Sequence, residues 1–242
     1  MNKTFLFDYD DTLAPNEFHY TIAQSAFLQW MLTRLGPKTP DAQTIFNHIA
    51  NTGTELVRTM GFRKERYPTT FKTVYHDLCA KFNHPCTEPD LSHAYDLGKL
   101  PFDKERYRLY GLFEGAEETL EFLAKQGNEL ILLTKGDYDV QREKLEATQM
   151  HKWFENRMHI VPNKNTAVIK EVLKHRNPHT AWHVGNSIRS DVTPALEAGI
   201  GMIYIPCETW AYEREHCGAP QHPKLITLET IAQIKDKYHE LQ

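Results

Sequence analysis

The sequence predicts an α/β protein, in which helices cover both faces of a parallel sheet, together with a separate helical unit. From about Gly111 onward, apolar stretches of strand length alternate with helical patterns. Alternating strands and helices are typical of a parallel sheet with helices on both faces. Between the first strand and Gly111, apolar residues recur instead at helical spacing, with Gly and Pro between the segments.

The first elements are one short strand and a run of helices. Lys3 to Phe7 is apolar enough for a buried strand, and it ends abruptly in an acidic loop that contains Asp8, Asp10 and Asp11. We expect Asp11 to be a turn former. Helical spacing then extends over three segments, namely Phe18–Leu35, Pro40–Met60 and Pro68–Phe82.

The second half of the chain repeats the strand and helix alternation to its end. The expected strands are Glu129–Leu133, His159–Val161, Ala181–Val184, Met202–Ile205 and Leu225–Leu228. The expected helices are Ala116–Lys125, Tyr138–Thr148, Thr166–His175, Asp191–Ala198 and Thr230–His239.

Composition excludes several classes of protein. The 242 residues allow one large domain or one domain with a substantial insertion. The formal net charge of −4 is spread along the chain, so nucleic acid is not an expected partner. No apolar run approaches the length of a membrane span, and the apolar start is too short for a signal peptide, so we expect a cytoplasmic protein.

The four cysteines are too few and too irregularly spaced for a disulfide framework. Cys207, His216, Cys217 and His222 could supply ligands to zinc, but their spacing fits no common zinc finger. We therefore expect reduced, mostly structural thiols, and zinc binding by this cluster stays the less favoured alternative.

Polar side chains follow three of the expected strands. The first strand is followed by Asp8, Asp10 and Thr12, and the second is followed by Thr134 and Lys135. A later strand, Ala181–Val184, is followed by the segment 185–191, which reads GNSIRSD. Because ligands bind at the carboxyl ends of parallel strands, these three strand ends are expected to meet at one crevice.

These motifs resemble those of the haloacid dehalogenase superfamily of phosphohydrolases. The likeness rests on Asp8-x-Asp10-x-Thr12, on Thr134 after an apolar strand, on a downstream lysine and on the acidic loop that ends at Asp191. It extends over nearly the whole chain. The resemblance implies a Rossmann-like core formed by residues 1–13 and 112–242, and a helical cap domain over 14–111.

The resemblance also implies a catalytic set. Asp8 would attack phosphorus and form an aspartyl-phosphate, while Asp10 would act as general acid and then as general base. Thr134 and Lys164 would complete the set, and both, together with Lys135, would bind the phosphate of the substrate. Lys164 precedes an expected helix, where the family places its lysine, and is favoured over the alternatives Lys144 and Lys170.

The implied cofactor is Mg²⁺, held by a set of oxygen donors drawn from Asp8, Asp10, Asn186 and Asp191. Asp10 would contribute its backbone carbonyl, and Asp191 would be either a ligand or an orienting residue. The family loop generally reads Gly-Asp, whereas this chain reads Gly185-Asn186, which removes one negative charge and predicts weaker binding of the metal. Whether Asn186 or Asp191 is the direct ligand stays open.

The expected function is Mg²⁺-dependent hydrolysis of small phosphate monoesters. The second acid, Asp10, disfavours the dehalogenase and phosphonatase branches of the family, which lack it. Two alternatives stay open: a phosphomutase of the same superfamily, and a catalytically silent protein that keeps the fold for binding. The expected partner is a small phosphorylated metabolite, bound by a monomer or a homodimer, with no role for nucleic acid or membrane.

Overall fold

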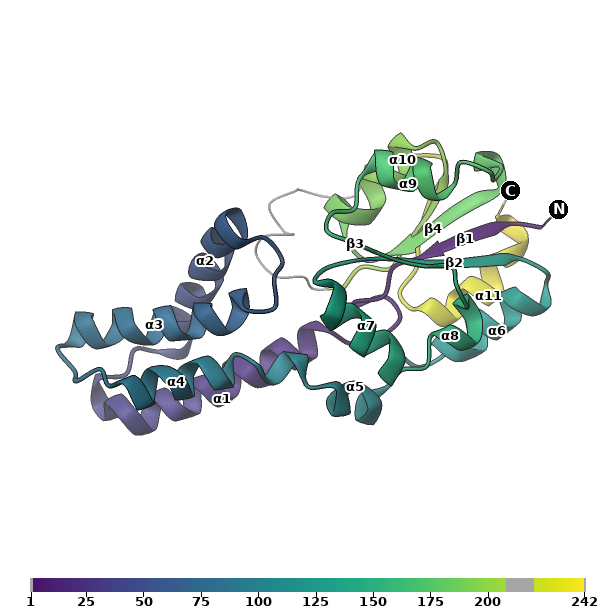
Figure 1. Ribbon diagram of the computed structural model, residues 1–242. Coiled ribbons are helices and arrows are strands. Elements are labelled where there is room, and N and C mark those ends of the chain that lie inside the picture. The colour runs from purple at the N-terminus through teal and green to yellow at the C-terminus, as the bar shows by residue number, and fades with distance from the viewer. Residues whose placement is uncertain (1, 208–219, 242) are drawn as a thin grey trace. The chain divides into compact units, whose positions relative to one another are not determined.

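The computed structural model describes residues 2–207 and 220–241, and within them a six-stranded, all-parallel sheet (Figure 1). The strand order is β3-β2-β1-β4-β5-β6. The strands are β1 Thr4–Phe7, β2 Glu129–Lys135, β3 Met158–Val161, β4 Ala181–Gly185, β5 Gly201–Tyr204 and β6 Leu225–Thr227. Each expected strand is present, and the predicted fold class is confirmed.

The chain divides into two compact units, one of which contains the whole sheet. The sheet unit consists of Met1–Pro15 and Lys104–Gln242, and the helical unit is Asn16–Asp103. The helices of the sheet unit are α5 Lys104–Tyr110, α6 Ala116–Lys125, α7 Tyr138–Ala147, α8 His151–Phe154, α9 Thr166–Val172, α10 Thr193–Glu197 and α11 Ile234–Lys237.

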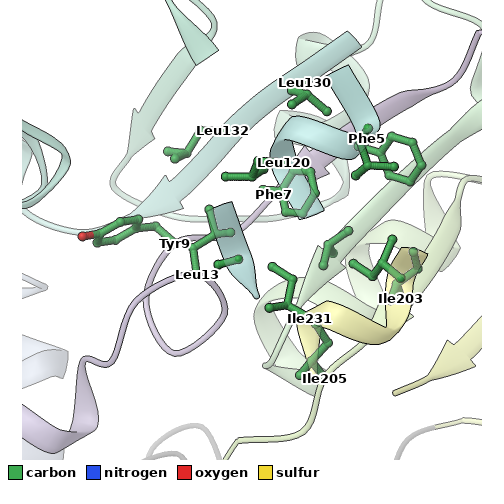
Figure 2. Packing of buried hydrophobic residues seen from close by; sticks show 14 of the residues in the cluster. Phe5, Phe7, Tyr9, Leu13, Leu120, Leu130, Leu132, Ile203, Ile205 and Ile231 are labelled. Atoms are coloured by element: carbon green, nitrogen blue, oxygen red, sulfur yellow. The ribbon is translucent and has the colours of Figure 1, made fainter. Parts of the chain in front are cut away.

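Alternate side chains of the strands enter two separate cores, one on each face of the sheet. On one face, Phe5 and Phe7 pack with Leu120 of α6, as Figure 2 shows. Phe154 of α8 belongs to the same cluster. On the other face, Leu6 belongs to a cluster with apolar residues of α9 and α10. The two-residue period of a strand therefore explains why three successive residues of β1, Phe5 to Phe7, are all apolar.

The central position of β1 determines where its acidic loop lies. Phe7 is in register with Leu132 of β2 on one side and with Val184 of β4 on the other. The backbone N–H of Asp8 continues this pairing by donating to the carbonyl of Val184 at 2.9 Å. The loops that follow β1, β2 and β4 consequently leave the sheet at the same edge.

The helical unit has its own aromatic core. Its helices are α1 Glu17–Leu35, α2 Ala42–Met60, α3 Arg66–Phe82 and α4 Glu88–Leu97. Phe27, Phe71 and Tyr75 are fully buried in this core. The side chain of Asp41 accepts from the backbone N–H of Thr44 and caps α2 at its N-terminus.

The second boundary between the units differs from the predicted one. The predicted cap, 14–111, includes α5, which the structure groups with the sheet unit. Tyr107 of α5 is buried, and its ring lies 5.1 Å from the Nζ atom of Lys144 on α7. A contact of this kind does not appear in the hydrophobic pattern of α5, which has only seven residues.

Several other details differ from the predicted elements. The helices α4, α5 and α8 were not predicted, although Thr87 caps α4 and Pro89 lies in its first turn. The expected helix Asp191–Ala198 is a π-helical turn over Ile188–Val192 followed by α10. Of the four residues considered for zinc, His216 and Cys217 lie outside the described residues. None of the helices in the described part of the chain has the length and apolarity needed to cross a membrane.

Candidate active site

The loop after β1 is a tight turn built on the carbonyl of Tyr9. This carbonyl accepts from the backbone N–H groups of Leu13 at 2.9 Å and Ala14 at 3.1 Å. Asp11 has a positive φ of 57° and donates its N–H to the carbonyl of Ala14 at 2.8 Å. The expectation that Asp11 forms the turn is therefore confirmed. The turn fixes Asp8 and Asp10 at the edge of the sheet.

Asp8 and Lys164 form a buried ion pair at this edge. The Nζ atom of Lys164 lies 2.6 Å from Oδ1 of Asp8, and it also contacts Oδ1 of Asp191. The side chains of Lys164 and Asp8 are 2% and 8% exposed, and that of Asp191 is fully buried. One ammonium group thus lies between two carboxylates in a site that excludes nearly all water.

Burial and the neighbouring charges shift the pKa values of this group in opposite directions. Burial raises the pKa of Asp8 to about 7; the negative charge of Asp191 adds to this shift and Lys164 opposes it. Burial disfavours the charged form of Lys164 as well, but the two carboxylates outweigh it and raise its pKa above the ordinary lysine value. The ammonium is therefore held in its charged form.

Asp191 is fixed on every side by contacts within the protein. Its Oδ1 lies 2.9 Å from Nε2 of His183, and its Oδ2 accepts from the backbone N–H of Ser187 at 2.9 Å. Burial opposes its ionisation, but Lys164 and His183 together hold the pKa of Asp191 below its usual range. Gly185 is required beside it, because a Cβ atom there would lie 2.4 Å from Cγ of Asp191. The side chain of Ser187 accepts from the N–H of Ser190 and caps the π-helical turn.

Thr12 links Asp8 to Asn186. Its hydroxyl Oγ1 lies 3.4 Å from Oδ2 of Asp8 and 3.4 Å from Oδ1 of Asn186. All three side chains are buried. Two oxygen acceptors, one charged and one neutral, therefore lie close together around a single hydroxyl.

At the end of β2, Thr134 and Lys135 differ in their surroundings. Thr134 is fully buried, and its hydroxyl has no hydrogen-bond partner among residues 2–207 and 220–241. Lys135 is half-buried, and its Nζ donates to Oγ of Ser190 at 2.8 Å. A buried hydroxyl without a partner costs about 1–3 kcal/mol, so its retention at this strand end needs an explanation outside stability.

The carboxylate of Asp10 is held from helix α7. Lys144 Nζ lies 2.8 Å from its Oδ1, and Nε2 of Gln141 donates to its Oδ2 at 2.6 Å. Asp137, at the end of the loop after β2, accepts from two backbone N–H groups and caps α7.

The structure thus brings most of the predicted site residues into one hydrogen-bonded set. Lys164 contacts both Asp8 and Asp191, and Asn186 is joined to Asp8 through Thr12. Asp10 follows the same strand as Asp8 and is bound by Lys144 and Gln141. Thr134 lies at the end of the neighbouring strand β2, but its hydroxyl makes no hydrogen bond within the described residues. Sequence reasoning missed three side chains of this set, namely Gln141, Lys144 as a partner of Asp10, and His183.

The donor set is suited to a hard cation. In the described part of the chain, no three His, Cys, Asp or Glu side chains converge as a metal cluster. The oxygen acceptors at this edge are instead the carboxylate of Asp8 and the amide oxygen of Asn186, beside the backbone of the tight turn after β1. Mg²⁺ takes oxygen ligands of these kinds and is usually held by only one or two carboxylates, so the residues present fit this ion.

In parallel α/β sheets ligands bind at the carboxyl ends of the strands, so the edge that holds the buried pair of Asp8 and Lys164 is the candidate active site. The model of the haloacid dehalogenase-like hydrolases matches residues 2–199. The chain belongs to this family of hydrolases.

Two curated proteins, both named glyceraldehyde 3-phosphate phosphatase, are similar to this chain. The protein of Methanothermobacter thermautotrophicus is 24% identical over 98% of this chain and 99% of its own length. The protein of Pyrococcus furiosus is 25% identical over 84% of this chain and 80% of its own. The relatives with curated names are therefore phosphatases.

Solved structures share the fold at lower identity. A haloacid dehalogenase-like hydrolase of Xanthomonas campestris superimposes with a TM-score of 0.76 at 20% identity, over 99% of this chain and 91% of that one. The hydrolase YfnB of Bacillus subtilis, solved with bound magnesium, superimposes with a TM-score of 0.60 at 15% identity. The match covers 100% of this chain and 99% of that one.

Proposed function

We propose that this protein is a Mg²⁺-dependent phosphatase that cleaves small phosphate monoesters through an aspartyl-phosphate on Asp8. The observation that carries the proposal is the buried ion pair of Asp8 with Lys164, 2.6 Å apart at the end of the central strand. A nucleophilic carboxylate must be presented at a fixed position, and the ammonium lies where it can offset the charge of an incoming phosphoryl group.

The covalent steps use the two acids of the first loop. A carboxylate oxygen of Asp8 attacks phosphorus, and the bond to the ester oxygen breaks as Asp10 transfers its proton to that oxygen. Asp10 then takes a proton from water, whose oxygen attacks phosphorus and releases phosphate together with the free Asp8 carboxylate. One difficult displacement is divided into two easier ones, and each residue returns to its starting state.

The remaining polar side chains bind the phosphoryl group. Thr134 donates its buried hydroxyl to a phosphoryl oxygen, which supplies the partner that this hydroxyl lacks among the described residues. Lys164 is a fixed positive charge beside the reacting oxygen, and Lys135 is a second cation at the end of β2. Donors that are already in place stabilise developing charge without reorganisation.

Asp8, Asn186 and the backbone carbonyl of Asp10 would hold Mg²⁺ in this protein. The ion would supply positive charge that brings a phosphate dianion next to two carboxylates. For Asp191 we propose an orienting role, because both of its oxygens already contact Lys164, His183 and the N–H of Ser187. The neutral amide of Asn186 is expected to make metal binding weaker than a carboxylate would.

The substrate class is proposed from the chemistry and from the relatives. The site provides one phosphoryl-binding set, which suits a monoester. The curated relatives are named for glyceraldehyde 3-phosphate, so three-carbon phosphate esters are the first to assay. A cytoplasmic location, where such metabolites are found, stays part of this proposal, and the choice between monomer and homodimer stays a prediction.

The test is release of inorganic phosphate from a panel of phosphorylated metabolites, with Mg²⁺ and with EDTA. We expect Mg²⁺-dependent release, and acid quenching during turnover should trap one phosphoryl group on the peptide that contains Asp8. Absence of release from every ester would favour the silent binding protein. Transfer that requires a bisphosphorylated sugar would favour the phosphomutase.

A further inference from the structure

The proton-transfer residue of the proposed reaction is held by two side chains that no family motif of the sequence contains. Each carboxylate oxygen of Asp10 has its own partner on α7. Oδ1 lies 2.8 Å from Nζ of Lys144, and Oδ2 accepts from Nε2 of Gln141 at 2.6 Å. Two contacts to the two oxygens of one carboxylate fix both its position and the rotation of its plane.

Lys144 is itself held in place by its surroundings. Its side chain is 4% exposed, and its ammonium lies over the ring of Tyr107, 5.1 Å from the ring centre. Its backbone carbonyl accepts from the hydroxyls of Tyr9 at 3.4 Å and Thr148 at 3.0 Å. Figure 2 shows the hydroxyl of Tyr9 pointing away from the apolar cluster. Consecutive residues of the catalytic loop, Tyr9 and Asp10, therefore bind the same turn of α7.

Gln141 also depends on a special position in the backbone. Its Nε2 donates to the carbonyl of Lys135 at 3.0 Å as well as to Asp10. A Cβ atom on Gly136 would lie 2.8 Å from this Nε2 and 3.1 Å from Cγ of Gln141. Gly136 thus leaves the space through which Gln141 extends across the end of β2 to Asp10.

Stability alone does not account for this arrangement. Removing an ammonium group and an amide from water is unfavourable, and apolar residues of similar volume would often stabilise such a position equally well or better. The carboxylate that receives both contacts is 21% exposed and could be solvated without them. What the two side chains add is a fixed orientation of Asp10.

We propose that Lys144 and Gln141 are positioning residues, which hold the carboxyl group of Asp10 where it exchanges a proton with the leaving oxygen and with water. This inference rests on the proposed phosphatase function. Proton transfer requires the heavy atoms to come within hydrogen-bond distance, and a displacement of about 1 Å can lower the rate about 100-fold. Both side chains therefore act through Asp10.

The experiment compares two esters in a double-mutant cycle. An alkyl phosphate releases a strongly basic alkoxide that needs a proton, whereas p-nitrophenyl phosphate releases a weakly basic phenolate that leaves without one. We expect Lys144→Met to lower kcat for the alkyl ester by about 10- to 100-fold, and to lower kcat for p-nitrophenyl phosphate much less. Lys144→Arg, which keeps a cation, should recover part of the loss.

The cycle with Asp10→Asn separates a positioning role from a structural one. If Lys144 acts through Asp10, Lys144→Met added to Asp10→Asn should lower the alkyl-ester rate by less than about twofold, because interacting residues are not additive. Lys170→Met, an exposed lysine on α9, is the matched control and should leave the rates unchanged. Losses that multiply in the double variant, or equal losses on both esters, would overturn the proposal.

Two further measurements keep the outcomes distinct. If thermal melting shows that Lys144→Met is unfolded, the same cycle is run with Gln141→Met, for which the same ester selectivity is expected. Wild-type turnover is measured first. If the wild type hydrolyses neither ester in Mg²⁺, the phosphatase function fails and the inference fails with it, whereas turnover without coupling between residues 144 and 10 overturns the inference alone.

Discussion

Thr134→Val offers a direct test of why a buried hydroxyl is kept without a partner. The side chain is fully buried at the end of β2, and its Oγ1 has no hydrogen bond among the described residues. An unsatisfied buried polar group costs about 1–3 kcal/mol. Valine has nearly the same shape as threonine and favours a strand, so the substitution removes this cost and introduces no void.

We therefore expect Thr134→Val to be more stable than the wild type in the absence of substrate. A gain of about 1–2 kcal/mol corresponds to a rise in Tm of about 2–8 °C for a protein of this size. Activity should change in the opposite direction. Loss of one donor to the phosphoryl group is expected to lower kcat by about 100-fold or more.

The matched control is Thr119→Val in the same unit. Thr119 is also fully buried, but its hydroxyl donates to the carbonyl of Ile231 at 3.3 Å. Removing that hydrogen bond should cost about 0.5–1.5 kcal/mol, with little effect on turnover. Calorimetric melts without ligand and phosphate-release assays in Mg²⁺ measure the two effects separately.

Two results would refute this reasoning. A loss of stability in Thr134→Val equal to that in Thr119→Val would show that the hydroxyl of Thr134 is hydrogen-bonded in the free protein. A gain in stability with unchanged turnover would show that this hydroxyl does not serve the reaction.

Three further predictions concern the nucleophile, the neutral ligand and the inserted unit. Asp8→Asn should fold but show no turnover. Burial raises the pKa of Asp8 from 3.8 to about 7, so ionisation of Asp8 opposes folding of the wild type. In EDTA the variant should therefore become more stable relative to the wild type as pH rises from about 4 to about 7. Flat pH profiles in paired urea titrations would contradict this. Asn186→Asp should place a second negative charge across the Thr12 hydroxyl from Asp8, and without metal the two should repel by a few kcal/mol at an effective dielectric near 20. The substitution should lower the Kd for Mg²⁺ about tenfold; identical calorimetric titrations of the two forms would place residue 186 away from the metal. Replacing Asn16–Asp103 by a short linker should leave a folded sheet unit that discriminates less among esters, and an unfolded product would show that the two units share one core.

The parts of the site that follow strands could be predicted from the sequence. A polar residue directly after an apolar strand is placed at the sheet edge by the strand itself, so Asp8, Thr134 and Asn186 needed no tertiary information. Lys164 follows no such rule, since it precedes α9. It could be predicted only through the resemblance of the motif order to a family.

The parts that were missed depend on tertiary contacts of polar residues within regular elements. Gln141 and Lys144 lie on the buried stripe of α7 beside Val140 and Leu145. Polar residues on an apolar stripe were the available signal, but helical periodicity does not say which loop they meet. His183 lies within the buried strand β4, where a single histidine in an apolar run was a comparable signal.

The position of β1 in the sheet has a consequence for how the chain folds. Both neighbours of β1 come from far along the sequence, since Thr4 pairs with Glu129 and with Ala181. During synthesis, β1 and its acidic loop must therefore remain without their partners until more than half of the chain has emerged. Contacts within the inserted helical unit are far more local and can form in the meantime. We therefore expect the helical unit to acquire structure first on the ribosome, and the nucleophile to be buried only after β4 has been made.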